Sequence, residues 1–234
     1  MKPTPLILLA VSLAITLLCG CQRLPGSLAD SEEPARPEEQ VDFSRLYQQN
    51  CSACHGNNGA GGPALDLANP QYQLLVDDAS LKRWITGGMP GTQMPASGDS
   101  AGGLLTERQV QALVAGIRAS WAHGNDRRED DMPPYVSSLT GDSQRGGKIY
   151  AADCLGCHRS GKQSITNTAY LALVSDQALR TIVIAGRPDL GHPGWKNTAA
   201  GYALSDQDVT DVVSYLASLR TSTPGQPYPE QQKR

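Results

Sequence analysis

Two segments of the chain place apolar residues at helical spacing behind a polar capping residue. The first follows Thr106, which has Gln109 three positions later, and the second follows Ser205. The residue just before a helix typically has a side chain that accepts a hydrogen bond from a free N–H group of the first turn. Thr106 and Ser205 can do so, and each segment therefore predicts a helix. The apolar residues recur three or four positions apart and predict one buried face per helix: Val110, Leu113, Val114, Ile117 and Trp121, and then Val209, Val212, Val213 and Leu216.

An uninterrupted run of apolar and weakly polar residues extends from Leu6 to Leu18. A helix of these thirteen residues would rise about 20 Å, which is shorter than the roughly 30 Å hydrocarbon core of a bilayer. We therefore interpret residues 1–20 as a signal peptide and not as a membrane span. Residues 21–40 are rich in acidic residues and proline and contain few large apolar residues, which predicts a flexible tether.

The rest of the chain contains an internal repeat. Residues 69–95 align with 167–193 without a gap at an offset of 98, and nine of the 27 positions are identical. Tyr47 and Tyr150 each stand four residues before a C-x-x-C-H motif. A period of about 100 residues is too long for a solenoid unit and favours two duplicated small domains.

Composition and charge narrow the class of protein. The formal net charge is -3, whereas nucleic-acid binders usually show a basic footprint. The chain contains a single Phe and only 5% aromatic residues, which is little material for two small cores. Its six cysteines form three close pairs, Cys19/Cys21, Cys51/Cys54 and Cys154/Cys157, and this spacing indicates covalent or metal chemistry instead of ordinary disulfides.

The two C-x-x-C-H motifs are typical of covalent haem attachment. The two thiols of each motif can add across the two vinyl groups of one porphyrin, and the adjacent histidine can bind the iron. This pattern predicts two haem c groups, held by Cys51, Cys54 and His55 and by Cys154, Cys157 and His158. Zinc binding by both motifs is the alternative, but neither repeat offers the further Cys or His pair of a tetrahedral zinc site.

Residues 41–220 resemble tandem class I cytochrome c domains. The resemblance rests on both motifs, on Tyr47 and Tyr150, on the segments 85–95 and 186–193, and on the two closing helices. It implies an all-α fold in which each domain is wrapped around one haem. We expect domains at 41–122 and 141–221, a linker at 123–140 and a C-terminal tail at 222–234.

The end of the signal segment resembles a bacterial lipoprotein box, with Leu18 and Gly20 before Cys21. That resemblance implies lipidation of Cys21 and an exported protein that is anchored to a membrane and faces the periplasm or the extracytoplasmic space. An ordinary cleaved signal, with two incidental cysteines, is the alternative.

The second axial ligand of each haem is assigned from the repeat. Met89 aligns with Arg187, which cannot bind iron, whereas Met94 aligns with His192, which can. Met94 also precedes a proline, as the ligand methionine of the family commonly does, so Met89 is interpreted as a packing residue. No methionine follows position 132. We expect one haem with His55 and Met94 as ligands and a second haem with His158 and His192. In one alternative, His192 lies at the surface and the second haem is five-coordinate or water-ligated. In another, His123 binds the second haem instead.

Closed axial positions favour electron transfer over catalysis at the iron. Because a thioether raises the reduction potential relative to a second imidazole, the second haem should have the lower potential. The expected partners are a redox protein donor and acceptor, with no nucleic acid. A permanent subunit of a quinol-oxidising or dehydrogenase complex is one alternative; a dihaem peroxidase or a sulfur-compound oxidoreductase is another, and it requires an open iron site.

Overall fold

The fold is seen in a computed structural model that describes residues 36–122, 128–159 and 164–221. Within these ranges the chain forms helices and no β-strand, which confirms the predicted all-α class. The signal segment, Cys21, His123 and the C-terminal tail lie outside the described residues. No helix in the described part of the chain is long and apolar enough to cross a membrane.

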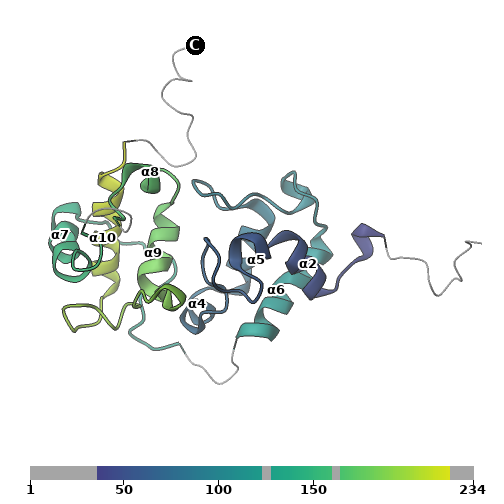
Figure 1. The fold of residues 1–234 in the computed structure, drawn as a ribbon, viewed down its shortest axis with the longest axis horizontal. Helices are drawn as coiled ribbons and strands as arrows, with labels where there is room; N and C mark the ends of the chain where they lie inside the picture. Colours follow the sequence, from purple (N-terminus) through teal and green to yellow (C-terminus); the bar gives the residue numbers. More distant parts are fainter. Residues whose placement is uncertain (1–35, 123–127, 160–163, 222–234) are drawn as a thin grey trace, which may run out of the picture. The chain divides into compact units, whose positions relative to one another are not determined.

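The described residues divide into two units, a short first one that ends at Glu39 and a second one that begins at Gln40. In the second unit, the first half of the chain contributes five helices (Figure 1). They are α2 (Phe43–Asn50), α3 (Ser52–His55), α4 (Pro70–Leu75), α5 (Asp78–Gly87) and α6 (Glu107–Trp121). Helix α6 is the predicted closing helix: it begins with a Thr106–Gln109 capping box and packs against α2 and α5.

The second half repeats this arrangement. Its elements are α7 (Ser143–Ile149), the π-helical turn η4 (Tyr150–Cys154), α8 (Thr168–Leu171), α9 (Asp176–Ala185) and α10 (Asp206–Ser218). Helix α9 spans the residues that correspond to α5 at the offset of 98, and Asn69 and Asn167 cap the helices before them. The predicted closing helix α10 begins at a Ser205 capping box and buries Val209, Val212, Val213 and Leu216.

Glycine lets the first and last helices of each half approach closely. A Cβ atom at Gly116 of α6 would meet the Phe43 ring at 2.1 Å, and one at Gly146 of α7 would meet the Asp211 carbonyl oxygen at 1.9 Å. Helix α7 therefore crosses α10 at backbone distance. The first half adds an aromatic cluster at its crossing, in which Phe43, Tyr47 and Trp121 lie 5.1 to 5.8 Å apart by ring centroid.

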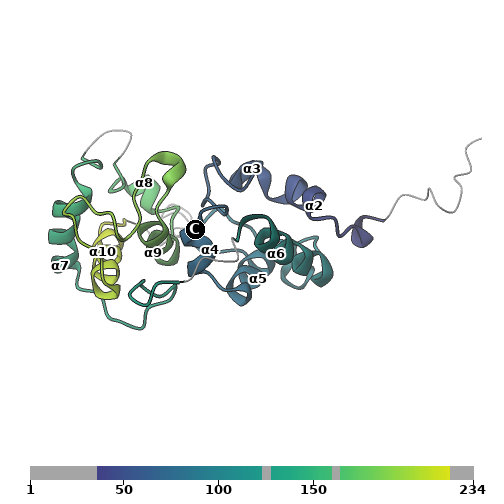
Figure 2. The same cartoon turned by 90° about the horizontal axis from the view of Figure 1, so that it is seen from below.

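The two halves contact each other through α4 and α9, which lie side by side in both views (Figures 1 and 2). Part of the predicted linker also packs. Tyr135 is buried; its hydroxyl accepts a hydrogen bond from Trp84 Nε1 of α5 at 2.7 Å, and its carbonyl accepts one from Arg180 Nε of α9 at 3.1 Å. The described part of this segment therefore forms hydrogen bonds with both halves.

Candidate haem sites

The first C-x-x-C-H motif forms a single helical turn, α3, that continues directly from α2. Cys51 caps this turn and is half-buried against the core, whereas Cys54 is exposed. Neither thiol forms a disulfide with another described residue. Burial raises the pKa of the Cys51 thiol to about 11, with the neighbouring Cys54 adding to the rise. The turn therefore offers two unpaired thiols one helical turn apart, as attachment to one porphyrin requires.

His55 is held in the tautomer that an iron ligand needs. Its Nδ1 lies 2.8 Å from the carbonyl oxygen of Leu65. Because a carbonyl oxygen can only accept, we assign the proton to Nδ1, which leaves the lone pair of Nε2 available to a metal. Burial lowers the pKa of His55 and so favours the neutral ring. The residues of this motif fit a covalently attached haem.

Two buried tyrosines hold the attachment motifs in place. The Tyr47 hydroxyl donates to the carbonyl oxygen of Gly56 at 2.8 Å, and the Tyr150 hydroxyl donates to that of His158 at 3.1 Å. In the sequence, these tyrosines stand out only by their position four residues before each motif. Their spacing was a usable signal, because a residue one turn before a motif lies on the same side of the helix.

The second motif begins in the π-helical turn η4, which ends at Cys154. Cys154 is half-buried and Cys157 is exposed, the same difference as in the first motif. Burial raises the pKa of the Cys154 thiol to about 11. The two motifs therefore present their thiols in matching environments.

The loops after α5 and α9 have equivalent connections. The Met89 N–H donates to the Met94 carbonyl oxygen at 3.1 Å, and the Arg187 N–H donates to that of His192 at 3.0 Å. Each loop starts at a glycine with positive φ, Gly88 or Gly186, where a Cβ atom would meet the carbonyl oxygen of Met94 or His192 at 2.8 Å. Met94 and His192 thus occupy corresponding places in three dimensions as well as in the alignment.

His192 lies close to the histidine of the second motif. The ring centroids of His158 and His192 are 5.8 Å apart. Nδ1 of His192 is buried and has no hydrogen-bond partner among the described residues, and burial lowers the pKa of this ring. A metal–imidazole bond is about 2 Å long, so two imidazoles on opposite sides of one metal have centroids roughly 6 Å apart. The pair fits a shared metal.

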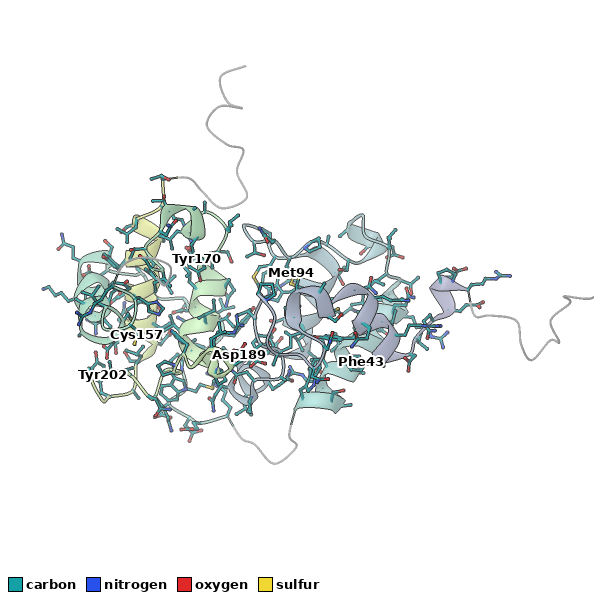
Figure 3. The ribbon with its side chains drawn as sticks, viewed as in Figure 1. Phe43, Met94, Cys157, Tyr170, Asp189 and Tyr202 are labelled. Atoms are coloured by element: carbon teal, nitrogen blue, oxygen red, sulfur yellow. The ribbon has the colours of Figure 1, made fainter. Side chains whose placement is uncertain are left out.

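The two methionines of the first loop differ in burial. Met89 is 8% exposed, whereas Met94, which is labelled in Figure 3, is half-buried and packs against the core. Both belong to the loop that follows α5, where the sequence predicts the axial ligand. The more buried position of Met89 agrees with its interpretation as a packing residue.

Comparison with known proteins assigns each half separately. Residues 39–115 match the family described as cytochrome c oxidase, cbb3-type, subunit III, and residues 143–220 match the family described as cytochrome c. Subunit CcoP of the cbb3-type cytochrome c oxidase of Azospirillum sp. (strain B510) is 28% identical over 134 residues, or 48% of this chain. The matched part covers 36% of that relative, so the chain spans only about a third of it.

Two solved structures show weaker likeness. A reducing HAO-like protein complex of Kuenenia stuttgartiensis is 17% identical, with a TM-score of 0.44, and the match covers 80% of this chain and 98% of that one. The dihydro-heme d1 dehydrogenase NirN is 27% identical, with a TM-score of 0.30, over 43% of this chain and 23% of that one. The assignment of the two halves therefore depends on the family matches.

Proposed function

Because the chain belongs to the class I c-type cytochromes, as a tandem of two domains with two covalently bound haem c groups, we propose that it passes single electrons between redox partners of a membrane-associated respiratory system. When bound, each haem supplies one-electron chemistry, with iron alternating between Fe(III) and Fe(II). The chain holds the haem, closes its axial positions and sets its potential.

We further propose two unlike ligand sets, His55 with Met94 and His158 with His192. The 5.8 Å separation of the His158 and His192 rings is the observation that carries the second assignment. The orphaned Nδ1 of His192 supports it, because buried ring nitrogens normally have a partner. The equivalence of the two loops supports Met94 in the first domain. Closed sites of this kind favour electron transfer over ligand chemistry.

A spectroelectrochemical titration of the full dihaem protein tests this proposal. We expect two resolved reduction potentials, with the lower one at the second domain, since two imidazoles stabilise Fe(III) better than imidazole and thioether do. The near-infrared charge-transfer bands should report methionine ligation for one haem only. A single unsplit high-potential wave, or carbon monoxide binding to either reduced haem, would contradict the two closed sites.

The match to a cbb3-type oxidase subunit supports a second candidate, a permanent electron-transfer subunit of an oxidase, quinol-oxidising or dehydrogenase complex. The matched relative is itself named as such a subunit. Extraction of native membranes in mild detergent distinguishes the two roles. A permanent subunit remains with its membrane partners through purification, whereas a carrier separates from them as the salt concentration rises.

We also propose that Cys21 is lipidated and anchors the protein to a membrane, facing the periplasm or extracytoplasmic space. The support is the sequence alone. Leu18 and Gly20 lie at the end of the signal segment, and Cys21 follows directly. The variant Cys21→Ser should move the protein from the membrane fraction to the soluble fraction. An unchanged membrane fraction, measured after a salt wash, would contradict a lipid anchor.

A further inference from the structure

Arg187 is fixed to the proposed ligand His192 by its backbone. It corresponds to Met89 of the first domain in the repeat, and it follows α9 directly. Its N–H donates to the His192 carbonyl oxygen at 3.0 Å, and the N–H of His192 donates back to the Arg187 carbonyl oxygen at 2.9 Å. Two reciprocal backbone hydrogen bonds therefore hold Arg187 and His192 together.

The guanidinium of Arg187 reaches the other domain. Its Nη2 donates to the Gly62 carbonyl oxygen at 2.9 Å. Gly62 itself lies against the first attachment motif, since a Cβ atom there would meet the Cys54 carbonyl oxygen at 2.1 Å. One side chain thus connects the distal loop of the second domain to the segment behind the first haem attachment site.

The Arg187 charge is buried and held in a fixed geometry. The side chain is 9% exposed and forms a two-point ion pair with Asp189, with Nε and Nη2 at 2.9 and 2.7 Å from the two carboxylate oxygens. A two-point ion pair of this kind fixes the orientation of the guanidinium and also strengthens its attraction to the carboxylate. The Asp66 carboxyl of the first domain also lies within electrostatic range of Arg187.

The same charge lies beside the segment that carries the proposed ligand His55. The Arg187 guanidinium donates to Gly62, which packs against the carbonyl oxygen of Cys54, the residue before His55. The Arg187 charge is therefore held next to the first attachment motif. A positive charge near a haem destabilises Fe(III) more than Fe(II), because the ferric site carries the larger positive charge.

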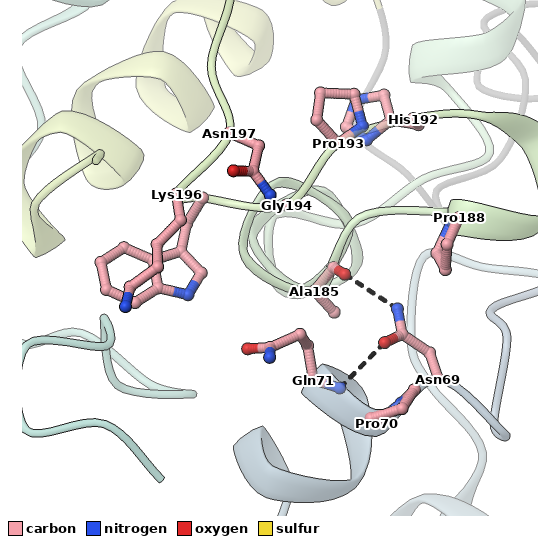
Figure 4. A pocket seen from close by; sticks show the side chains of 11 residues that line it. Asn69, Pro70, Gln71, Ala185, Pro188, His192, Pro193, Gly194, Lys196 and Asn197 are labelled. Carbon is pink, nitrogen blue, oxygen red and sulfur yellow. Dashed lines mark hydrogen bonds between the residues drawn. The ribbon is translucent and has the colours of Figure 1, made fainter. Parts of the chain in front are cut away.

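Asn69 makes a second connection at the same place. Its Nδ2 donates to the carbonyl oxygens of Ala185 and Gly186 at 2.8 and 3.3 Å, while its Oδ1 accepts the Gln71 N–H and caps α4 (Figure 4). The last carbonyls of a helix need such partners, and here a neutral side chain from the other domain supplies one. His192 lines a cavity of about 360 Å³ beside this contact.

We propose that Arg187 is a positioning residue for electron transfer between the two haem domains, which fixes the His192 loop against the first attachment motif and raises the potential of the first haem. This proposal rests on the proposed function. The step it assists is balanced within the chain: one Fe(II) loses one electron, the other Fe(III) gains it, and no bond or proton changes place. The higher potential of the first haem directs the electron from the second domain to the first.

Charge variants of the full dihaem protein test the electrostatic part. Arg187→Gln should lower the potential of the first haem, Arg187→Lys should leave it near the wild-type value, and Asp189→Asn should shift it in the opposite direction, upward. Asn69→Ala is the matched control, since it removes a contact between the domains without a change in charge. In this variant the potential of the first haem should stay at the wild-type value. Equal potentials in wild type and Arg187→Gln, or an equal fall in Arg187→Lys, would overturn the proposal.

Rapid photoreduction tests the positioning part, with a soluble one-electron donor dye as the reductant. The wild-type protein should show electron exchange between the haems after the flash, and Arg187→Gln should show slower exchange. If the wild type itself shows no exchange, the proposed function fails; if exchange occurs and is equally fast in Arg187→Gln, only the role of Arg187 fails. Should Arg187→Gln not incorporate haem, the opposite shift in Asp189→Asn still decides the electrostatic part.

Discussion

At the scale of single residues, the two domains use equivalent loops to present Met94 and His192, the proposed axial ligands. Corresponding backbone hydrogen bonds hold Met94 and His192, and a positive-φ glycine precedes each loop. The loops differ elsewhere, for example at Met89 and Arg187, but the proposed ligand position carries Met94 in one loop and His192 in the other. A change of that one residue should therefore change the haem potential without a change of fold.

The substitution His192→Met should raise the potential of the second haem by on the order of 0.1 V, part of the roughly 0.8 V range that axial ligands cover. The reason is that a thioether stabilises Fe(II) relative to a second imidazole. The reciprocal variant Met94→His is the matched control and should lower the potential of the first haem. A redox titration measures both. An unchanged second potential in His192→Met would mean that His192 is not on the iron.

The methionines of the first loop should respond differently to removal. Met94→Ala should open the first haem to carbon monoxide, which the visible spectrum of the reduced protein reports. Met89→Ala should keep the site closed and instead reduce the free energy of unfolding by about 2 to 3 kcal/mol, because it leaves a cavity at a buried position. Carbon monoxide binding in Met89→Ala, but not in Met94→Ala, would reverse the assignment.

At the scale of elements, the crossing of the first and last helices of each half depends on glycine. Gly146 of α7 faces the Asp211 carbonyl of α10 with no room for a Cβ atom. Asp211 is also buried, and its carboxylate accepts hydrogen bonds from the Asp142 N–H at 2.7 Å and from Gln207 Nε2 at 2.8 Å. The residue that would have to move is therefore already fixed on several sides.

Gly146→Ala should accordingly lower the free energy of unfolding by about 3 kcal/mol, although alanine is the better helix former by about 1 kcal/mol. Chemical denaturation followed by the far-UV circular dichroism signal measures the loss. Gly87→Ala is the control, because Gly87 is also helical and, apart from its chain neighbours and its own helix backbone, no described atom lies within 4 Å of its added Cβ. A neutral Gly146→Ala would show that α7 and α10 can separate at little cost.

At the scale of the whole molecule, residues 128–140 between the two halves are part of the packing. Tyr135 and Met132 are buried in the core, and the carbonyl oxygens of Pro134 and Tyr135 both accept hydrogen bonds from Arg180. The hydroxyl of Tyr135 meets Trp84 of the first half. The stability of the two halves should therefore be coupled through this segment.

A double-mutant cycle on Trp84→Phe and Tyr135→Phe measures that coupling. Each single variant should lose about 1 kcal/mol, the usual net contribution of one hydrogen bond, and the double variant should lose less than the sum. Denaturant titration of all four proteins provides the free energies of unfolding. Strictly additive losses would show that the 2.7 Å hydrogen bond does not contribute to stability.

The sequence by itself determined the class of the protein and much of its chemistry. Motif spacing is local, so Cys51, Cys54 and His55 and their repeat could be recognised without a fold. Helical periodicity and capping residues are local as well, and α6 and α10 begin where Thr106 and Ser205 predict. The gapless repeat predicted that Met94 and His192 correspond, and the equivalent loops agree with it.

Tertiary structure alone decided which distant residues meet. Nothing in the local sequence places Arg187 beside Gly62, or Asn69 beside Ala185, because these pairs are more than a hundred residues apart. The repeat gave no sign of a role for Arg187. Its alignment with Met89 indicated only that Arg187 cannot bind iron. The physical reason is that ion pairs and helix-end contacts depend on three-dimensional proximity, which periodicity and spacing do not encode.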